Sequence, residues 1–242
     1  GLARVLDSLD RGVSSGKITG REREQAALRL RLTTDLGDLV DRQLVVEAIA
    51  EDEAAKTAVF RDLDRIVEDP DAVLASNTSS IPIIKLAMAT TRPHRVIGMH
   101  FFNPVPVLPL VELVSTLETG DTVRSRAERF AEQVLGKQVV HSTDRAGFVV
   151  NALLVPYLLS AIRMAESGAA SPEDIDKAMV LGCAHPMGPL ALADLVGLDT
   201  VKAIADAMYA ESKEPLYSPP PLLLRMVEAG RLGKKAGHGF YR

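Results

Sequence analysis

Cysteine is nearly absent from this sequence of 242 residues, in which Cys183 is the only one. A lone cysteine excludes a disulfide within the chain and fits a reducing compartment. No apolar run is long enough to span a bilayer, and no basic segment followed by an apolar one marks the chain for secretion. We therefore expect a cytoplasmic protein that has no membrane partner.

An excess of basic charge is also lacking. The 28 Lys and Arg residues are scattered among 32 Asp and Glu residues, and the formal net charge is −4. This balance gives no basic surface for a polyanion, so we expect no nucleic-acid partner. The five histidines show no pair with metal-ligand spacing, and the lone cysteine has no second ligand beside it. We expect no bound metal.

A glycine-rich phosphate loop is the third absence. A G-x-G-x-x-G motif between a strand and a helix would let the helix N-terminus hold a pyrophosphate. The nearest glycine spacings, at 12, 16 and 20 and at 233, 237 and 239, have no apolar strand before them. Judged on the residues alone, a dinucleotide site is incomplete.

The first part of the sequence has strands that alternate with helices. Short apolar runs predict strands at 44–50, 72–76, 94–100, 110–114 and 138–140. Helical spacing occupies the segments 53–67, 80–89 and 121–135. This alternation predicts an α/β layer in which helices cover a largely parallel sheet.

After about residue 142 the strand signal disappears. Helices are predicted at 148–167, from Ser171 onward, and at 199–211 and 221–229, before a glycine-broken tail at 233–241. We therefore divide the chain into an α/β domain, residues 1–141, and a helical domain, residues 142–242.

His100 and Glu112 are the residues that most strongly indicate chemistry. Each lies in an apolar, strand-like run, where an ionisable group is costly unless it is paired. A proline-rich bend joins the two runs, so the strands can fold back on each other and bring the pair together. A histidine held by a carboxylate is a common proton-transfer group. Either residue alone is more often structural, but the pair indicates an enzyme.

Two further segments carry polar groups with two interpretations each. The loop 75–80 follows a strand, where ligands bind in open α/β sheets, but Ser79 or Ser80 could instead cap the next helix. Asn151 lies in an apolar helix, where its amide must bond either to a neighbouring helix or to a ligand.

Seven segments taken in order resemble the 3-hydroxyacyl-CoA dehydrogenase family, most closely its short-chain bacterial branch. They are 46–51 (VEAIAE), 76–80 (SNTSS), 100–104 (HFFNP), Glu112, 147–151 (GFVVN), 185–189 (HPMGP) and 233–241 (GKKAGHGFY). The resemblance implies a doubly wound, Rossmann-type NAD-binding domain followed by an all-α domain that binds substrate and forms a homodimer.

The resemblance also implies an oxidoreductase. It would interconvert short-chain 3-hydroxyacyl-CoA and 3-oxoacyl-CoA, such as 3-hydroxybutyryl-CoA and acetoacetyl-CoA, by hydride transfer in fatty acid or butanoate metabolism. NAD is the implied cofactor, with NADP left open because the ribose-binding acid of the family is not in the sequence. His100 matches the catalytic base of the family, and Glu112 matches the carboxylate that orients it.

Other positions carry implied roles. Ser79 and Asn151 match residues that act in catalysis by holding the C3 oxygen and thioester region of the substrate. Lys17, or Ser8, would meet the CoA moiety. The implied cofactor-binding positions, near the nicotinamide ribose, are Glu51, Lys56, Asn77 and Asn103.

The front of the sequence departs from the family pattern. The first strand, the glycine-rich turn and the second strand with its ribose-binding acid have no counterpart, and such a unit needs roughly 30 residues or more. We therefore expect a truncated chain whose sheet is incomplete at its N-terminal side. Two alternatives remain open, namely a related dehydrogenase of hydroxy acids without CoA and a non-catalytic form that dimerises or binds acyl-CoA.

Overall fold

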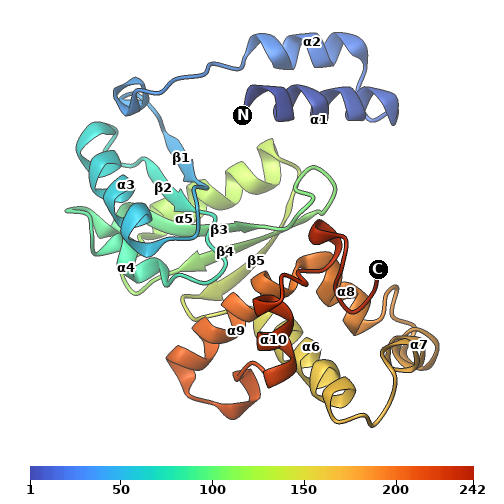
Figure 1. The fold of residues 1–242 in the computed structure, drawn as a ribbon. Coiled ribbons are helices and arrows are strands. Elements are labelled where there is room, and N and C mark those ends of the chain that lie inside the picture. The colour runs from blue at the N-terminus through green and yellow to red at the C-terminus, as the bar shows by residue number, and fades with distance from the viewer.

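The computed structural model describes all 242 residues, which form an α/β region followed by a helical region (Figure 1). One sheet contains β1 (Leu44–Glu47), β2 (Val73–Ser76), β3 (Val96–Phe101), β4 (Leu110–Ser115) and β5 (Gln138–Thr143), in that order. Strands β1, β2 and β3 run parallel, β4 is antiparallel to β3, and β5 is parallel to β4. The β3–β4 connection is too short for the crossover that a parallel pair needs.

Helices cover both faces of this sheet. They are α3 (Glu53–Ile66), α4 (Ile83–Ala87) and α5 (Asp121–Arg129), the last continued by a π-helical turn, η3 (Phe130–Val134). Phe60 of α3 and Leu86 of α4 are buried in one apolar cluster with the sheet, and Val123 of α5 is buried in another. Two covered faces make a doubly wound, Rossmann-type layer, which confirms the predicted fold class.

Several elements begin or end at residues other than the sequence predicts, and three of these boundaries share a physical cause. Strand β1 ends at Glu47 rather than at residue 50, α4 begins at Ile83 rather than at residue 80, and α6 begins at Val150 rather than at residue 148. Near each boundary a side-chain carboxylate accepts main-chain N–H groups. Carboxylates therefore replace regular backbone hydrogen bonds at these positions.

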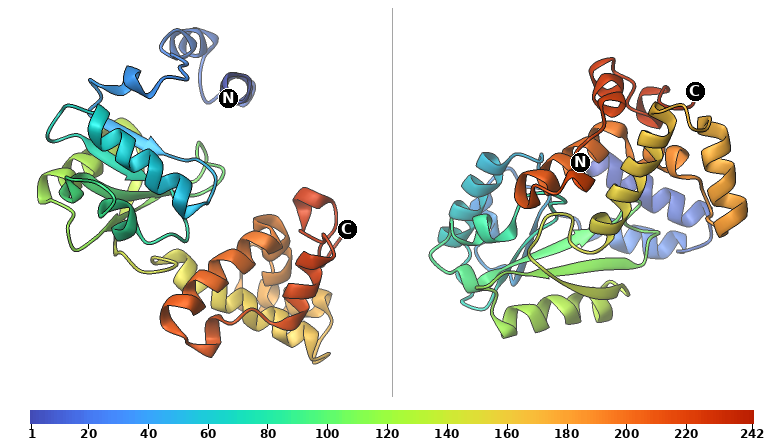
Figure 2. Two further views of the ribbon diagram at one scale, coloured as in Figure 1. Left: turned by 60° about the vertical axis from the view of Figure 1, so that its left-hand side comes forward. Right: turned by 90° about the horizontal axis from the view of Figure 1, so that it is seen from below.

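The helical region packs around the apolar middle of α6. It contains α6 (Val150–Glu166), α7 (Pro172–Cys183), α8 (Pro189–Val196), α9 (Leu198–Ser212) and α10 (Pro221–Glu228). Leu158 and Leu159 of α6 are fully buried in a core shared with the other four helices. The left view of Figure 2 shows this bundle beside the α/β region.

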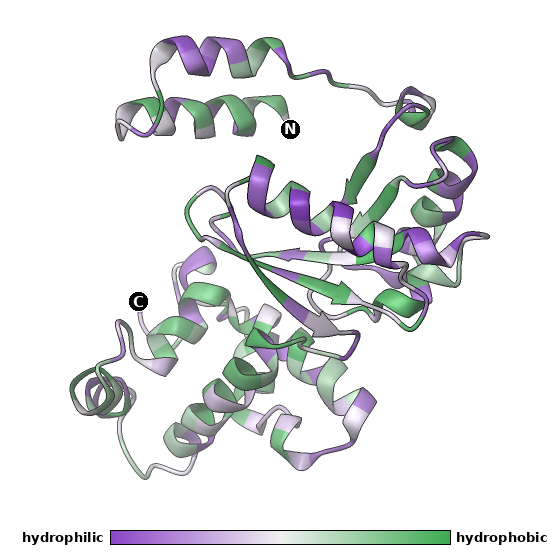
Figure 3. Cartoon of the chain, turned by 180° about the vertical axis from the view of Figure 1, so that it is seen from behind, coloured by the Kyte–Doolittle hydropathy of each residue, from purple (hydrophilic) through white to green (hydrophobic).

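Helices α1 (Leu2–Ser14) and α2 (Gly20–Leu28) form a hairpin at the start of the chain (Figures 1 and 2). Thr19 and Glu22 form a capping box at the start of α2. Apolar and polar segments mix along α1, whereas most of α2 is polar (Figure 3). Neither helix buries a residue. None of the helices in the chain has both the length and the apolar content needed to cross a bilayer.

Asp64, near the end of α3, forms a buried polar cluster apart from the strand ends that carry His100. Its Oδ2 accepts the N–H and the hydroxyl of Thr91 at 2.7 and 2.6 Å, and its Oδ1 accepts Arg92 Nε at 3.0 Å. Burial raises the pKa of Asp64, but the Thr91 hydrogen bonds and Arg92 outweigh burial, so its pKa lies below its usual value.

We predict that Asp64→Asn lowers the free energy of unfolding by about 2 kcal/mol at pH 7, because charge-assisted hydrogen bonds are lost. A carboxyl with a depressed pKa in the folded state stabilises the protein above its unfolded pKa, and this contribution is lost as the pH falls through the folded value. Urea unfolding at several pH values measures the difference between the two proteins. The difference in the free energy of unfolding should be constant from neutral pH down to about 5 and shrink in more acidic buffer. A difference that grows on acidification would contradict the assignment.

Candidate active site

His100 and Glu112 face each other across the antiparallel pair β3 and β4. They are partners in the strand register, so their side chains lie on the same face of the sheet. His100 Nδ1 lies 2.7 Å from Glu112 Oε2, and the two side chains are 5% and 0% exposed. An ionised carboxylate only accepts hydrogen bonds, so Nδ1 carries the proton and Nε2 can accept. The pairing expected from the sequence is present.

The other oxygen of Glu112 binds the start of α6. Glu112 Oε1 accepts the N–H of Val149 at 3.0 Å and that of Val150 at 2.8 Å. Gly147 and Phe148 just before them have φ values of +82° and +47°, which turn the chain so that these N–H groups point at the carboxylate. The positive end of the helix dipole adds to the attraction. Three donors thus replace the water that the buried carboxylate has lost.

Ser79 extends this pair to three groups. Its Oγ lies 3.0 Å from His100 Nε2, so hydroxyl, imidazole and carboxylate form one hydrogen-bonded chain. No side chain of its own loop caps α4, whose N-cap is Pro82. The interpretation of Ser79 or Ser80 as a simple helix cap is therefore wrong.

Two aromatic rings fix the plane of the imidazole. Phe102 and Phe148 contact the His100 ring edge to face, with centroid distances of 4.6 and 5.4 Å. One ring comes from the β3–β4 connection and the other from the turn that enters α6. The His100 ring is thus contacted from both the α/β region and the helical region.

Glu51 accepts several hydrogen bonds from the loop that carries Ser79. Its Oε1 accepts Ser79 N at 3.1 Å, Ser80 N at 3.2 Å, Ser80 Oγ at 2.9 Å and the Thr78 hydroxyl. Burial raises the pKa of Glu51, but the hydrogen bonds from Thr78 and Ser80 and the charge of Lys56 outweigh it, so the pKa lies below its ordinary value. Glu51 is therefore ionised at neutral pH.

Asn77 and Asn103 flank the same strand ends. Asn77 Oδ1 accepts the N–H of Phe101 at 2.8 Å, while its amide nitrogen forms no hydrogen bond within the chain. This fixed amide has two N–H donors left for a ligand. Asn103 is exposed in the β3–β4 connection.

Asn151, Lys17 and Ser8 are not joined to this cluster. Asn151 lies in the first turn of α6, next to Val150, and its side chain is nearly buried without a hydrogen bond to Ser79 or His100. Lys17 is exposed in the turn between α1 and α2, and Ser8 lies on α1. No contact links either of these two to His100.

Glu47 is a residue at this site that the sequence analysis did not single out. It is 4% exposed at the end of β1, and its Oε1 lies 2.7 Å from Nζ of the buried Lys56. The sequence feature that indicated Glu112 could also have indicated Glu47, because both residues are carboxylates within apolar strand-like runs.

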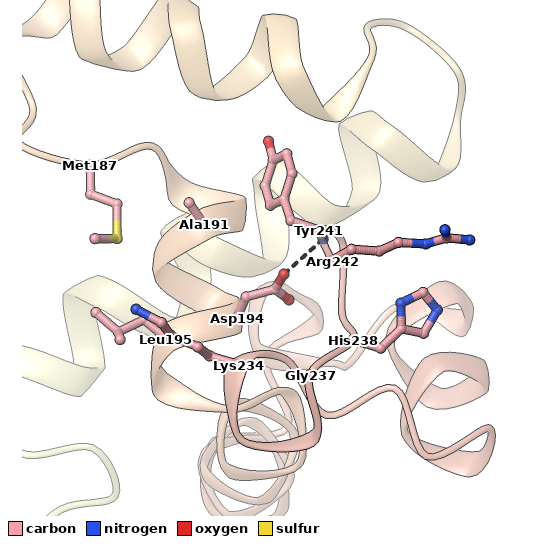
Figure 4. A pocket seen from close by; sticks show the side chains of 9 residues that line it. All are labelled: Met187, Ala191, Asp194, Leu195, Lys234, Gly237, His238, Tyr241 and Arg242. Carbon is pink, nitrogen blue, oxygen red and sulfur yellow. Dashed lines mark hydrogen bonds between the residues drawn. The ribbon is translucent and has the colours of Figure 1, made fainter.

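Two cavities lie in the helical region. One, of about 290 Å³, lies between α8 and the C-terminal tail, beside the hydrogen bond from Tyr241 N to Asp194 (Figure 4). The other, of about 700 Å³, is an apolar groove along α6 that begins at Val149 and Val150 and reaches His185 and Met187. The groove therefore starts where α6 binds Glu112.

Comparisons with known proteins agree with this architecture. Residues 1–145 match the family model described as 3-hydroxyacyl-CoA dehydrogenase, NAD binding domain, and residues 147–242 match that of the C-terminal domain. The chain is 68% identical to the 3-hydroxybutyryl-CoA dehydrogenase of Mycobacterium tuberculosis, over 100% of this chain and 84% of that protein. It is 46% identical to a probable 3-hydroxybutyryl-CoA dehydrogenase of Bacillus subtilis, over 100% of this chain and 83% of that protein.

Solved structures give the same result. The crystal structure of M. tuberculosis FadB2 superposes with a TM-score of 0.98 at 68% identity, covering 100% of this chain and 85% of that one. The (S)-3-hydroxybutyryl-CoA dehydrogenase PaaH1 of Ralstonia eutropha gives a TM-score of 0.94 at 45% identity, covering 99% and 84%. The resemblance found from the sequence is confirmed, and the chain belongs to the 3-hydroxyacyl-CoA dehydrogenase family.

Proposed function

We propose that the protein is an NAD-dependent 3-hydroxyacyl-CoA dehydrogenase that interconverts 3-hydroxybutyryl-CoA and acetoacetyl-CoA. The observation that carries the proposal is the hydrogen-bonded chain from Ser79 Oγ through His100 to Glu112. It ends in a hydroxyl and an imidazole nitrogen that can both meet one substrate oxygen. The names of the relatives give the substrate class.

His100 is the general acid and base in this proposal. In the oxidative direction its Nε2 removes the proton from the C3 hydroxyl of the substrate, and in the reductive direction the imidazolium donates that proton to the C3 oxygen. Glu112 holds Nδ1–H and stabilises the imidazolium. NAD, when bound, accepts or supplies the hydride at C3.

Ser79 and Asn151 orient the substrate in this proposal. Ser79 Oγ donates to the C3 oxygen once substrate displaces it from His100 Nε2, and the unpartnered Asn151 amide faces the thioester region. Both contacts stabilise charge on the reacting oxygens. We assign contact with the CoA moiety to Lys17, with Ser8 as the second candidate.

The nicotinamide end of NAD fits the edge where β1, β2 and β3 end, because ligands of open α/β sheets bind outside the carboxyl ends of the strands. The free amide N–H groups of Asn77, the exposed Asn103 and the partly exposed Glu51 supply polar contacts there. Lys56, also assigned to the cofactor site from the sequence, contributes to it through Glu51. NAD rather than NADP is the cofactor we assign.

We further propose that the chain is a homodimer joined through residues 142–242, with residues 1–141 forming the NAD domain. Leu153 and Leu181 in the helical region are 73% and 74% exposed, and Leu153 lines the apolar groove along α6. Exposed apolar patches of this kind mark protein interfaces. Residence in the cytoplasm and a part in fatty acid or butanoate metabolism complete the proposal.

His100→Gln in the full-length protein should lower kcat for acetoacetyl-CoA reduction by roughly 10²–10⁴, the usual share of a general base. The dissociation constant for NADH should not change, because His100 is proposed to meet the substrate. Stopped-flow measurement of NADH oxidation separates the two quantities, with free acetoacetate as the control for a site that does not require CoA. A variant as fast as the wild type would refute the role of His100.

Glu112→Gln should lower kcat by roughly 10³ or more, since an amide NH₂ facing Nδ1 favours the opposite imidazole tautomer. Glu211→Gln is the matched control. Glu211 also accepts a main-chain N–H at the junction, from Ala146 at 3.1 Å, but does not touch His100. The control should retain wild-type kcat. Equal losses in the two variants would mean that Glu112 acts only by joining the two regions.

Leu153→Glu should convert the dimer to a monomer, because a charge in an apolar interface lacks a partner. Leu117→Glu, at a position 97% exposed in the α/β region, should leave the dimer intact. Sedimentation equilibrium of the three proteins measures the mass. A monomeric wild type, or a dimer unaffected by Leu153→Glu, would contradict the proposed interface.

A further inference from the structure

Lys56 is a buried cation enclosed by two carboxylates. Its side chain is 1% exposed, and Nζ lies 2.7 Å from Glu47 Oε1 and 3.4 Å from Glu51 Oε2. The third contact of Nζ is the carbonyl oxygen of Ile49 at 3.4 Å. Nζ thus donates hydrogen bonds to Glu47 and to the Ile49 carbonyl, and Glu51 adds an ion pair. Lys56 is therefore held in place by groups of the chain itself.

The two carboxylates extend from Lys56 to the loop of Ser79. Glu47 is 4% exposed, and its Oε2 accepts the hydroxyl of Ser76 at 2.7 Å, at the end of β2. Glu51 binds the other side of the loop through the main-chain N–H groups of Ser79 and Ser80. The loop is thus held at both ends by acids that share one lysine.

This arrangement fixes the position of one catalytic group. Residues 77–80 lie beyond the end of β2, and the N–H groups of Ser79 and Ser80 depend on Glu51 for an acceptor. Ser79 Oγ must lie 3.0 Å from His100 Nε2, and that distance follows from where the Ser79 main chain is held. Misplacing a reacting group by about 1 Å can cost on the order of 10²-fold in rate.

We propose that Glu47, Lys56 and Glu51 form a positioning relay that sets Ser79 against His100. Glu47 is the element of the relay farthest from the chemistry: it touches neither Ser79 nor His100, and it acts by fixing Lys56 and Ser76. The proposal rests on the proposed dehydrogenase activity.

Glu47→Gln tests the relay in the full-length protein. The variant keeps the size of the side chain but removes the charge that holds Lys56. We expect kcat for acetoacetyl-CoA reduction to fall roughly 10- to 100-fold, a larger change than that in the dissociation constant for NADH. Weaker NADH binding with unchanged kcat would show that Glu47 serves the cofactor site alone and does not position Ser79, and it would overturn the proposal.

Asp64→Asn is the matched control for loss of a buried carboxylate. Asp64 is also 4% exposed and also accepts hydrogen bonds from a neighbouring loop, but it has no link to Ser79. The Asp64→Asn variant should be less stable than the wild type and keep the wild-type kcat. Should Glu47→Gln fail to fold, Ser76→Ala removes the hydrogen bond to Glu47 and the one accepted from Thr78 N, and it should lower kcat about three- to tenfold.

A double-mutant cycle identifies the group through which the relay acts. In the Ser79→Ala background, Glu47→Gln should lower kcat by less than about twofold, because the hydroxyl that the relay positions is gone. The same loss with and without that hydroxyl would overturn the proposal. Failure of the wild type to reduce acetoacetyl-CoA would refute the proposed function, whereas an active wild type matched by Glu47→Gln would refute the relay alone.

Discussion

The carboxylate of Glu112 is the interaction on which the rest of the site depends. One oxygen holds the imidazole of His100 in β3 at 2.7 Å, and the other holds the first N–H groups of α6 at 2.8 and 3.0 Å. Because the side chain is fully buried, a shift of α6 away from the sheet would leave a buried charge short of donors, which is strongly destabilising. The entry of the helical region and the orientation of the catalytic ring are therefore set by the same group.

Carboxylates play a similar part elsewhere along this edge of the sheet. Asp144 accepts the N–H groups of Ile83 and Ile84 at the start of α4, and Glu51 accepts those of the loop before it. Loops at strand ends leave N–H groups that regular secondary structure does not use. Acids satisfy them here and hold the loops in one arrangement. Catalysis benefits because the reacting groups need little reordering when substrate binds.

The sequence predicted the parts of this site that leave a local signal. An ionisable residue in an apolar strand marked both His100 and Glu112, and the short proline-rich bend predicted that their strands pair. Alternating apolar runs predicted the sheet and its covering helices. The sequence could not place Val149 and Val150 as donors to Glu112, because that contact joins segments 37 and 38 residues apart and depends on two left-handed residues. It likewise overlooked Glu47, although the same rule that found Glu112 applies to it.

The tautomer of His100 tests the central claim most directly. A long-range ¹H–¹⁵N correlation spectrum of the ¹⁵N-labelled full-length protein at neutral pH distinguishes a protonated ring nitrogen from an unprotonated one. If Glu112 orients the imidazole, His100 gives a protonated Nδ1 and an unprotonated Nε2, and Glu112→Gln abolishes that pattern. A proton on Nε2, or the averaged signals of a free imidazole in the wild type, would contradict the account.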